Sequence, residues 1–353
     1  MNERIAVAAA RLSVPRAAVA DSFVLHASLE LMARVGLLAY ADPADHDRML
    51  DAIDDLADRY EAWGEPAPTP AAVDMSSAEA LDACVRAGDV DGADAALLWL
   101  AAHHDPTELR HELAPAVVDA LGAAGHTPIG LHLLAAVDPP LPPTLLRGAL
   151  RDLAGEGEWR IHWLRDEQAA AGSSLEDALR AAPHLGSPGS DFIYPLMRQA
   201  DESGWAARLI GPHLDAPDAG RTVIRAAAWS MLHDDAAHAP YGWTHSLTLP
   251  QAVLRLAGKG IDQRTAVAVA GTFLLGFRLA HGTVPLGSLD DAATAPIEPR
   301  PVAQLAAEAG CHLDAHLVKY TLACFHAAED DPAWRAVYLA AATYLADWWR
   351  TAC

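Results

Sequence analysis

Apolar residues recur three and four positions apart along almost the whole chain, and this spacing is the strongest constraint on its fold. Such a period places apolar side chains on one face of an α-helix, whereas a half-buried strand requires strict alternation. Alternating β-branched runs bounded by turns are scarce. We therefore predict an all-α protein, a compact multi-helix single domain over residues 1–353. Its helices are expected at 27–38, 44–63, 78–102, 114–123, 145–153, 221–232, 250–256, 263–279, 301–309, 312–328 and 332–350.

Proline and glycine divide these helical segments. A Pro/Ala-rich stretch at 64–76 is expected to be linker-like, and 282–300 a long loop that is a candidate lid. No repeat of fixed period is visible.

The charge balance excludes several kinds of partner. Twenty-five basic residues against 47 acidic ones give a formal net charge of −22, which disfavours nucleic acid and anionic membrane surfaces. No apolar run reaches the roughly 18 residues of a spanning helix, and no signal peptide is expected. The four cysteines are widely spaced and form no CxxC pair. We expect a soluble, cytoplasmic protein.

The common catalytic and nucleotide-binding motifs are absent. The sequence contains no GxGxxG, no GxxxxGK[ST], no Gly-x-Ser-x-Gly and no HExxH, so it does not support dinucleotide, P-loop, serine-hydrolase or zincin chemistry. It is, however, rich in histidine, with 17 residues. An enzymatic function would therefore depend on histidine.

Most of the histidines lie in acidic stretches of the sequence and are best interpreted as solvated or capping residues. Four histidines lie beside apolar segments that are expected to be helical, namely His26, His126, His245 and His316. Histidine is the commonest metal ligand, and several helices can bring imidazoles to one point. We expect two of these histidines to lie near helix starts, where Thr127 would cap a helix beginning at Pro128, and Thr248 and Pro250 would mark another.

Lysine is the rarest basic residue, since only Lys259 and Lys319 are present among 25. His316, Lys319, Tyr320 and Ala323 share one helix face. A lysine packed among apolar neighbours loses charge more easily, and a neutral amine can add carbon dioxide to give a carbamate, an oxygen ligand for a metal. The plainer interpretation is a lysine that extends its ammonium into water.

Four motifs, in order, resemble the questin oxidase-like family. The first is His26 followed by Asp58-Arg59-Tyr60 and the Pro-rich 66–70; the second is His126-Thr-Pro-Ile129; the third is His245-Ser-Leu-Thr-Leu-Pro250; the fourth is His316-Leu-Val-Lys319 with its following Thr and Ala. Together they extend from residue 22 to about 346.

The resemblance implies a helical non-haem iron oxygenase that uses Fe(II) and O2 on an aromatic polyketide or related natural product, by Baeyer–Villiger-like oxidation or ring cleavage. The implied centre lies between helices. Its ligands would be His26, His126, His245, His316 and a carbamylated Lys319, the last three of these carrying the catalysis. His132 competes for a place in the ligand set. The sequence does not indicate whether NAD(P)H takes part or which oligomer forms.

Aromatic residues are candidates to line a pocket for the small aromatic substrate, and plain core packing is the alternative for each. Those favoured most are Tyr241, Trp243, Phe277 and Tyr320, with Trp229, Phe273 and Phe325 behind them. Glu30 and Asp234 are candidates to accept hydrogen bonds from ligand imidazoles.

Two other classes of function remain open. His233-Asp234, with the scattered histidines, suggests a metal-dependent hydrolase of the His-Asp type. The absence of a strict catalytic signature suggests a non-catalytic helical protein that binds a natural product or a partner.

Overall fold

The computed structural model describes residues 2–17, 22–71, 78–120, 123–137, 140–156, 160–165, 173–189, 193–289 and 295–352. Within these ranges the chain is helical, and its only extended pairings are two isolated bridges, Arg16 with Pro66 and Ala120 with Arg160. The all-α class is confirmed. None of the helices in these ranges is long and apolar enough to cross a bilayer.

Contacts divide the chain into two compact units. The first comprises Met1–Arg160, Lys259–Ile261 and Ala306–Lys319, and the second Ile161–Gly258, Asp262–Leu305 and Tyr320–Cys353. The single domain expected from the sequence stays a prediction.

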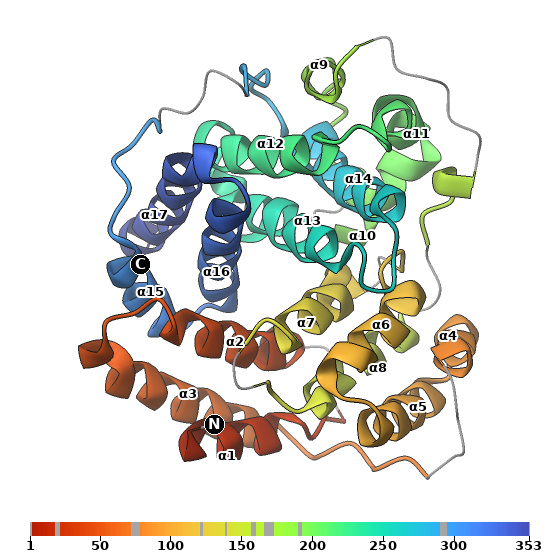
Figure 1. Cartoon of the computed structure of the whole chain (residues 1–353), viewed down its shortest axis with the longest axis vertical. Coiled ribbons are helices and arrows are strands. Elements are labelled where there is room, and N and C mark those ends of the chain that lie inside the picture. Colours follow the sequence, from red (N-terminus) through yellow and green to blue (C-terminus); the bar gives the residue numbers. More distant parts are fainter. Residues whose placement is uncertain are drawn as a thin grey trace. The chain divides into compact units, whose positions relative to one another are not determined.

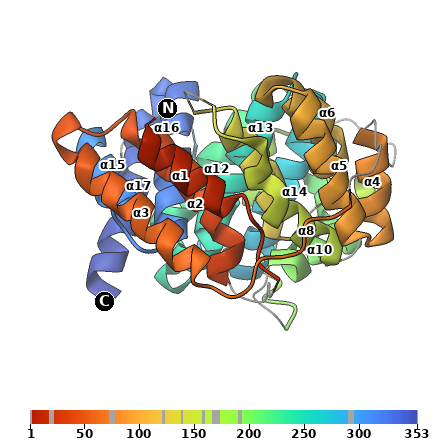
Figure 2. The ribbon, with the colours of Figure 1, turned by 90° about the horizontal axis from the view of Figure 1, so that it is seen from below.

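The first unit is built around helices α2 (Ser22–Leu38) and α7 (His126–Leu134), most of whose residues are buried. Its helices are α1 (Glu3–Leu12), α2 (Ser22–Leu38), α3 (His46–Glu61), α4 (Ala78–Ala87), α5 (Val90–His103), α6 (Pro106–Val117), α7 (His126–Leu134) and α8 (Arg147–Gly155). Helix α2 packs on α7, while α1 and α3 lie together along α2 (Figures 1 and 2). All nine residues of α7 are buried. An all-round apolar helix of this kind is stable only inside a core.

A charged pair inside α2 holds a distant segment of the same unit. Arg34 and Glu30 are both buried, and Arg34 Nε donates to Glu30 Oε1 at 3.0 Å. The guanidinium also donates to the carbonyls of Gly310 and His312. This pairing satisfies both buried charges and fixes the chain just before Asp314.

The second unit packs around α14. Its helices are α9 (Leu175–Arg180), α10 (Ile193–Glu202), α11 (Trp205–Leu209), α12 (Ala219–His233), α13 (Thr244–Leu256), α14 (Gln263–His281) and α17 (Arg335–Ala352). Every residue of α14 from Ala266 to His281 is buried, and α10, α12 and α13 surround it. Helices α15 (Val302–Gly310) and α16 (Ala315–Asp330) have residues in both units.

Several helix limits differ from those expected. The helix expected at 78–102 is broken by Gly88, which has a φ of +70°, and restarts after Asp89, whose side chain caps Gly92 N at 2.9 Å. The helix expected at 114–123 instead ends at Val117.

The segment expected to be a long loop has no regular structure where it is described, and its role as a lid stays a prediction. Residues 282–289 and 295–301 contain no helix, and 290–294 lie outside the described residues. Likewise 64–71 are non-helical, while 72–77 of the predicted linker lie outside.

Replacing Arg34 with Met should lower the free energy of unfolding by about 3–5 kcal/mol, because it leaves the Glu30 charge buried and unpaired. Urea denaturation would measure this loss. The double variant Glu30→Met/Arg34→Met should recover part of it, since no lone charge remains. Arg48→Met, which removes a surface pair with Asp45, should cost less than about 1 kcal/mol. Equal losses for Arg34→Met and Arg48→Met would contradict this account.

Acid should destabilise the protein partly through His326 on α16. Burial, followed by the charge of Arg255, lowers the pKa of His326 to about 4. The unfolded chain therefore takes up a proton between pH 6.5 and 4 that the folded chain refuses, so stability present above pH 6.5 is lost as the pH falls to 4. His326→Gln should remove up to about 3 kcal/mol of that loss. Thermal unfolding at stepped pH measures it, with the exposed His103→Gln as the control. Parallel pH profiles for both variants would refute the assignment.

Candidate metal centre

His26 lies in the first turns of α2 and is buried. Its Nδ1 is 3.1 Å from Ser22 Oγ, one helical turn earlier. A hydrogen bond at Nδ1 orients an imidazole and selects Nε2 as its coordinating atom. Ser22 was not predicted for this role, although its i−4 spacing from His26 was a readable signal.

His126 is the first residue of α7 and follows two residues in the left-handed region. Ala124 has a φ of +53° and Gly125 a φ of +72°. The expected helix start at Pro128 with Thr127 as cap is wrong, because the turn at 124–125 begins the helix two residues earlier. Thr127 Oγ1 instead donates to Ala149 O at 3.1 Å.

His316 is held by Asp314 at the start of α16. Asp314 Oδ1 accepts the His316 backbone N–H at 2.8 Å and lies 3.2 Å from its ring Nδ1. The backbone N–H of Asp314 in turn donates to His312 Nδ1 at 3.0 Å. Asp314 therefore fills the role expected of Glu30 and Asp234. The Asp-x-His spacing at a helix start was the signal that the sequence reasoning missed.

The three imidazoles converge within the first unit. The ring centroid of His26 lies 4.5 Å from that of His126 and 4.5 Å from that of His316, both edge-on. A ring nitrogen of His26 and one of His316 are within 4.8 Å of each other. Burial lowers the pKa of His126 and of His316, which favours the neutral imidazole, the form that binds metals.

Lys319 completes this cluster from the next turn of α16. It is 3% exposed, and its Nζ has no hydrogen-bond partner among the residues that the structure describes. Both ring nitrogens of His126 are likewise buried without such a partner in the described parts of the chain. Burial lowers the pKa of Lys319 to about 8, against the opposing effect of Asp314 and Glu30. The interpretation of an ammonium extended into water is contradicted by this burial.

The donor set fits a divalent transition metal. Neutral imidazoles suit zinc, copper, iron and nickel, and an amine converted to its carbamate adds an anionic oxygen. Orphaned buried polar atoms are costly unless something binds them, and Lys319 and His126 supply three such atoms in one cluster.

His245, the fourth predicted imidazole, belongs to the second unit. It lies at the start of α13, where its Nδ1 is 2.7 Å from Tyr241 O and its ring stacks with Phe277 at 6.4 Å. Helix α13 begins at Thr244, so Thr248 and Pro250 do not mark its start and Pro250 lies inside it. The membership of His245 in the ligand set stays a prediction.

His132 competes less well than His126. It is buried on the same helix, but six residues correspond to about 600° of helical rotation, so it emerges from another side of α7. His126 is the one whose ring contacts His26.

The predicted accepting carboxylates are occupied by arginines. Glu30 pairs with Arg34, and Asp234 accepts from Arg278 Nη1 at 3.0 Å and from the Val284 backbone N–H at 3.0 Å. His233 stacks on Trp229, with centroids 4.4 Å apart. This arrangement does not favour the His-Asp hydrolase, whose Asp would have to be available to a metal.

The predicted pocket aromatics are mostly core residues. Trp243, Phe277 and Tyr320 are fully buried, as plain packing would have them, and their contact with substrate stays a prediction. Tyr241 is 55% exposed, so it does not line an enclosed pocket. The second-rank candidates Trp229, Phe273 and Phe325 are also buried.

No protein-family model, curated protein or solved structure matches this chain. The resemblance to the questin oxidase-like family therefore stays a prediction that rests on the motifs quoted above.

Ala124→Gly should raise the free energy of unfolding by about 0.5–1 kcal/mol. Left-handed backbone costs a non-glycine residue roughly 1–2 kcal/mol, and the greater freedom of glycine in the unfolded chain offsets only part of that gain. Chemical denaturation would show it. Ala124→Val should act in the opposite direction, because a branched side chain tolerates this conformation worse. A loss of stability in Ala124→Gly would contradict the argument.

Proposed function

We propose that this chain is an iron(II)-dependent oxygenase whose centre is held by His26, His126, His316 and the carbamate of Lys319. The observation that carries the proposal is the Lys319 amine, which is buried without a hydrogen-bond partner among the described residues beside converging imidazoles. His245 is proposed as a further ligand, and the aromatic polyketide substrate as the class to be oxidised. These last two proposals rest on the family resemblance.

Burial lowers the pKa of Lys319 to about 8, so part of the amine is neutral near neutral pH and this part can form the carbamate. The neutral Nζ lone pair attacks the carbon of CO2, a nitrogen–carbon bond forms as one carbon–oxygen π bond opens to give a carboxylate oxygen, and the released N–H proton passes through the neighbouring imidazoles to solvent. The product carries one negative charge, which offsets part of the charge of a divalent cation. Arg at this position cannot do the same, because its guanidinium stays protonated.

The chain's own groups prepare the remaining ligands. Ser22 orients the His26 ring and Asp314 orients that of His316, which fixes the tautomers and reduces the entropy lost on binding. Burial excludes water from the cluster and strengthens each electrostatic interaction within it. When bound, iron(II) would supply the electrons that activate dioxygen.

Mixed nitrogen and oxygen donors favour iron over a structural zinc. Structural zinc sites are closed and tetrahedral and are usually rich in cysteine, whereas imidazole and carboxylate-type oxygen together suit non-haem iron. A carbamate resembles a carboxylate in both charge and bite.

Elemental analysis of protein purified without chelator should find about one equivalent of iron. Lys319→Ala and Lys319→Arg should both lose it, because neither side chain can form the carbamate. Lys259→Ala is the matched control, since it removes the chain's other lysine, and it should keep its iron. Carbon-13 bicarbonate should give a carbamate signal in the wild type and in Lys259→Ala only.

The competing interpretations give different results. Iron kept by Lys319→Arg would remove the carbamate from the site, and a wild type without metal would overturn the proposal. His245→Ala should lower iron content while His132→Ala and His233→Ala retain it. The His-Asp hydrolase would instead require His233 and spare Lys319.

A further inference from the structure

Five arginines are buried among the residues that the structure describes, and four of them pair with a carboxylate. The pairs are Arg34 with Glu30, Arg147 with Asp94, Arg160 with Asp82 and Asp119, and Arg278 with Asp234. This pairing is expected, because a buried charge is costly unless a counter-charge compensates it. Arg16 is the exception, since it is 6% exposed and no carboxylate in the described part of the chain pairs with it.

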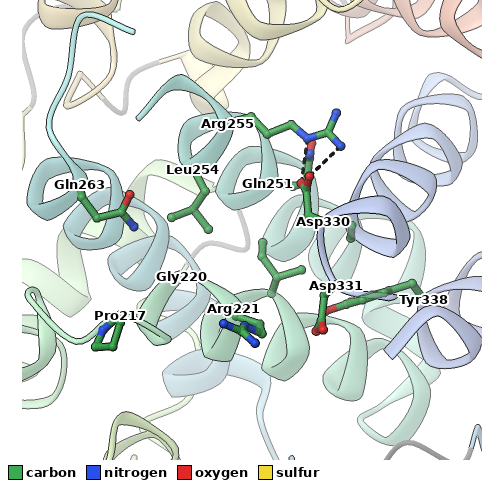
Figure 3. A pocket seen from close by; sticks show the side chains of 12 residues that line it. Pro217, Gly220, Arg221, Gln251, Leu254, Arg255, Gln263, Asp330, Asp331 and Tyr338 are labelled. Atoms are coloured by element: carbon green, nitrogen blue, oxygen red, sulfur yellow. Dashed lines mark hydrogen bonds and ion pairs between the residues drawn. The ribbon is translucent and has the colours of Figure 1, made fainter. Parts of the chain in front are cut away.

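Part-buried arginines at the larger pocket of the second unit follow the same pattern. That pocket has a volume of about 280 Å³. Arg255 donates there to Asp330 at 2.7 and 3.0 Å (Figure 3), and Arg225 donates to Asp331 at 2.7 and 3.1 Å. These arginines and carboxylates compensate one another, which leaves the buried charge of Arg16 to be explained.

Two uncharged groups contact the guanidinium of Arg16. Its Nη1 donates to Gly64 O at 3.3 Å, a long hydrogen bond, and its Cζ lies 4.8 Å from the centroid of the Tyr60 ring. Burial raises the pKa of Tyr60, so the phenol stays neutral, and its hydroxyl donates to Val14 O at 3.1 Å. A carbonyl and an aromatic face offset the charge of a guanidinium only in part.

The surroundings of Arg16 add positive charge. Arg151 Nη1 lies 2.9 Å from Asp91 Oδ1 and 3.0 Å from Asp94 Oδ2. Asp94 is already held by Arg147, which donates to it at 2.7 and 2.9 Å. The three arginines therefore share two aspartates, and the side chain of Asp91 is 66% exposed. One positive charge is left over in this part of the first unit.

A small cavity lies beside Arg16 and Arg151. Its volume is about 10 Å³, close to the least that holds one water molecule. The other residues that line it are mostly apolar, namely Pro15, Val24, Leu25, Tyr60 and Gly148. Apolar walls reduce the screening of charge, so the two guanidinium groups attract a negative ion more strongly here than they would in water.

We propose that this cavity binds one small monovalent anion, of about the size of chloride, beside Arg16 and Arg151. The anion supplies the negative charge that Arg16 lacks, in the place that a carboxylate takes at the other four buried arginines. A large organic anion such as gluconate does not fit. The proposal does not depend on the metal centre, and its test requires no iron.

Chloride-35 NMR of the full chain tests binding directly. The protein should broaden the chloride line, and added bromide should remove the excess width by competition. The chain has a net charge of −22, so unspecific attraction of anions is weak. Arg16→Gln should weaken binding at least about tenfold, because it removes a charged hydrogen-bond donor. Arg208→Gln is the matched control, since Arg208 also lies over an aromatic ring, that of Trp205, and it should behave as the wild type does.

Thermal unfolding separates a bound anion from a purely structural role of Arg16. At equal ionic strength the wild type should melt at a higher temperature in sodium chloride than in sodium gluconate, since a ligand of the folded state stabilises it. Arg16→Gln should abolish this difference. A purely structural Arg16 would lower the melting temperature equally in both salts and leave the difference in place.

Arg151→Gln should weaken chloride binding about threefold, and it tests the proposal even if Arg16→Gln fails to fold. Three results would overturn the proposal: no excess line width, equal melting temperatures of the wild type in the two salts, or wild-type chloride binding in both variants. A cavity that holds only water would give the first two.

Discussion

One buried arginine determines the arrangement of the candidate centre. Arg34 reaches from α2 to the carbonyls of Gly310 and His312, 276 and 278 residues further along the chain. Asp314 then takes its place beside His312 and caps α16, which carries His316 and Lys319. The Glu30 carboxylate makes this possible, because without it the guanidinium would be buried with no counter-charge. The proposed ligands on α2 and α16 are therefore held together by Arg34, which is not itself a proposed metal ligand.

Desolvation is the common cause of the chemistry at this cluster. It disfavours the charged forms of His126, His316 and Lys319 alike, and so produces the lone pairs that a cation or carbon dioxide requires. The same burial would be a liability in a protein with no ligand to bind, because each orphaned nitrogen lowers stability. As the proposed metal centre, the cluster would exchange stability for binding, as functional sites commonly do.

The helical class was within reach of the sequence, because periodicity sets it. Apolar surroundings and the scarcity of lysine made His26, His126, His316 and Lys319 candidates, whereas their meeting in one centre was implied by the family resemblance. The partners of the imidazoles were missed because Ser22 and Asp314 are ordinary capping residues until the fold is known. Glu30 and Asp234 were assigned wrongly for a related reason. Their arginine partners lie four and 44 residues away. The positions of charged residues in a sequence do not show whether a carboxylate will pair with an arginine or with an imidazole. In the turn at 124–125 only the second residue is a glycine, and nothing in the sequence indicates that Ala124 before it is also left-handed.

The enclosure of the Lys319 amine has a kinetic consequence. Carbon dioxide is small and uncharged, so it can diffuse through a packed interior, whereas bicarbonate cannot. The proposed centre would then fill in a fixed order. Carbon dioxide would react first with Lys319, and the cation would bind afterwards to the carbamate oxygen. In the proposed centre the bound cation would hold the carbamate oxygen, so carbon dioxide would be released only after the cation had left, and a filled centre would outlast the atmosphere in which it was assembled.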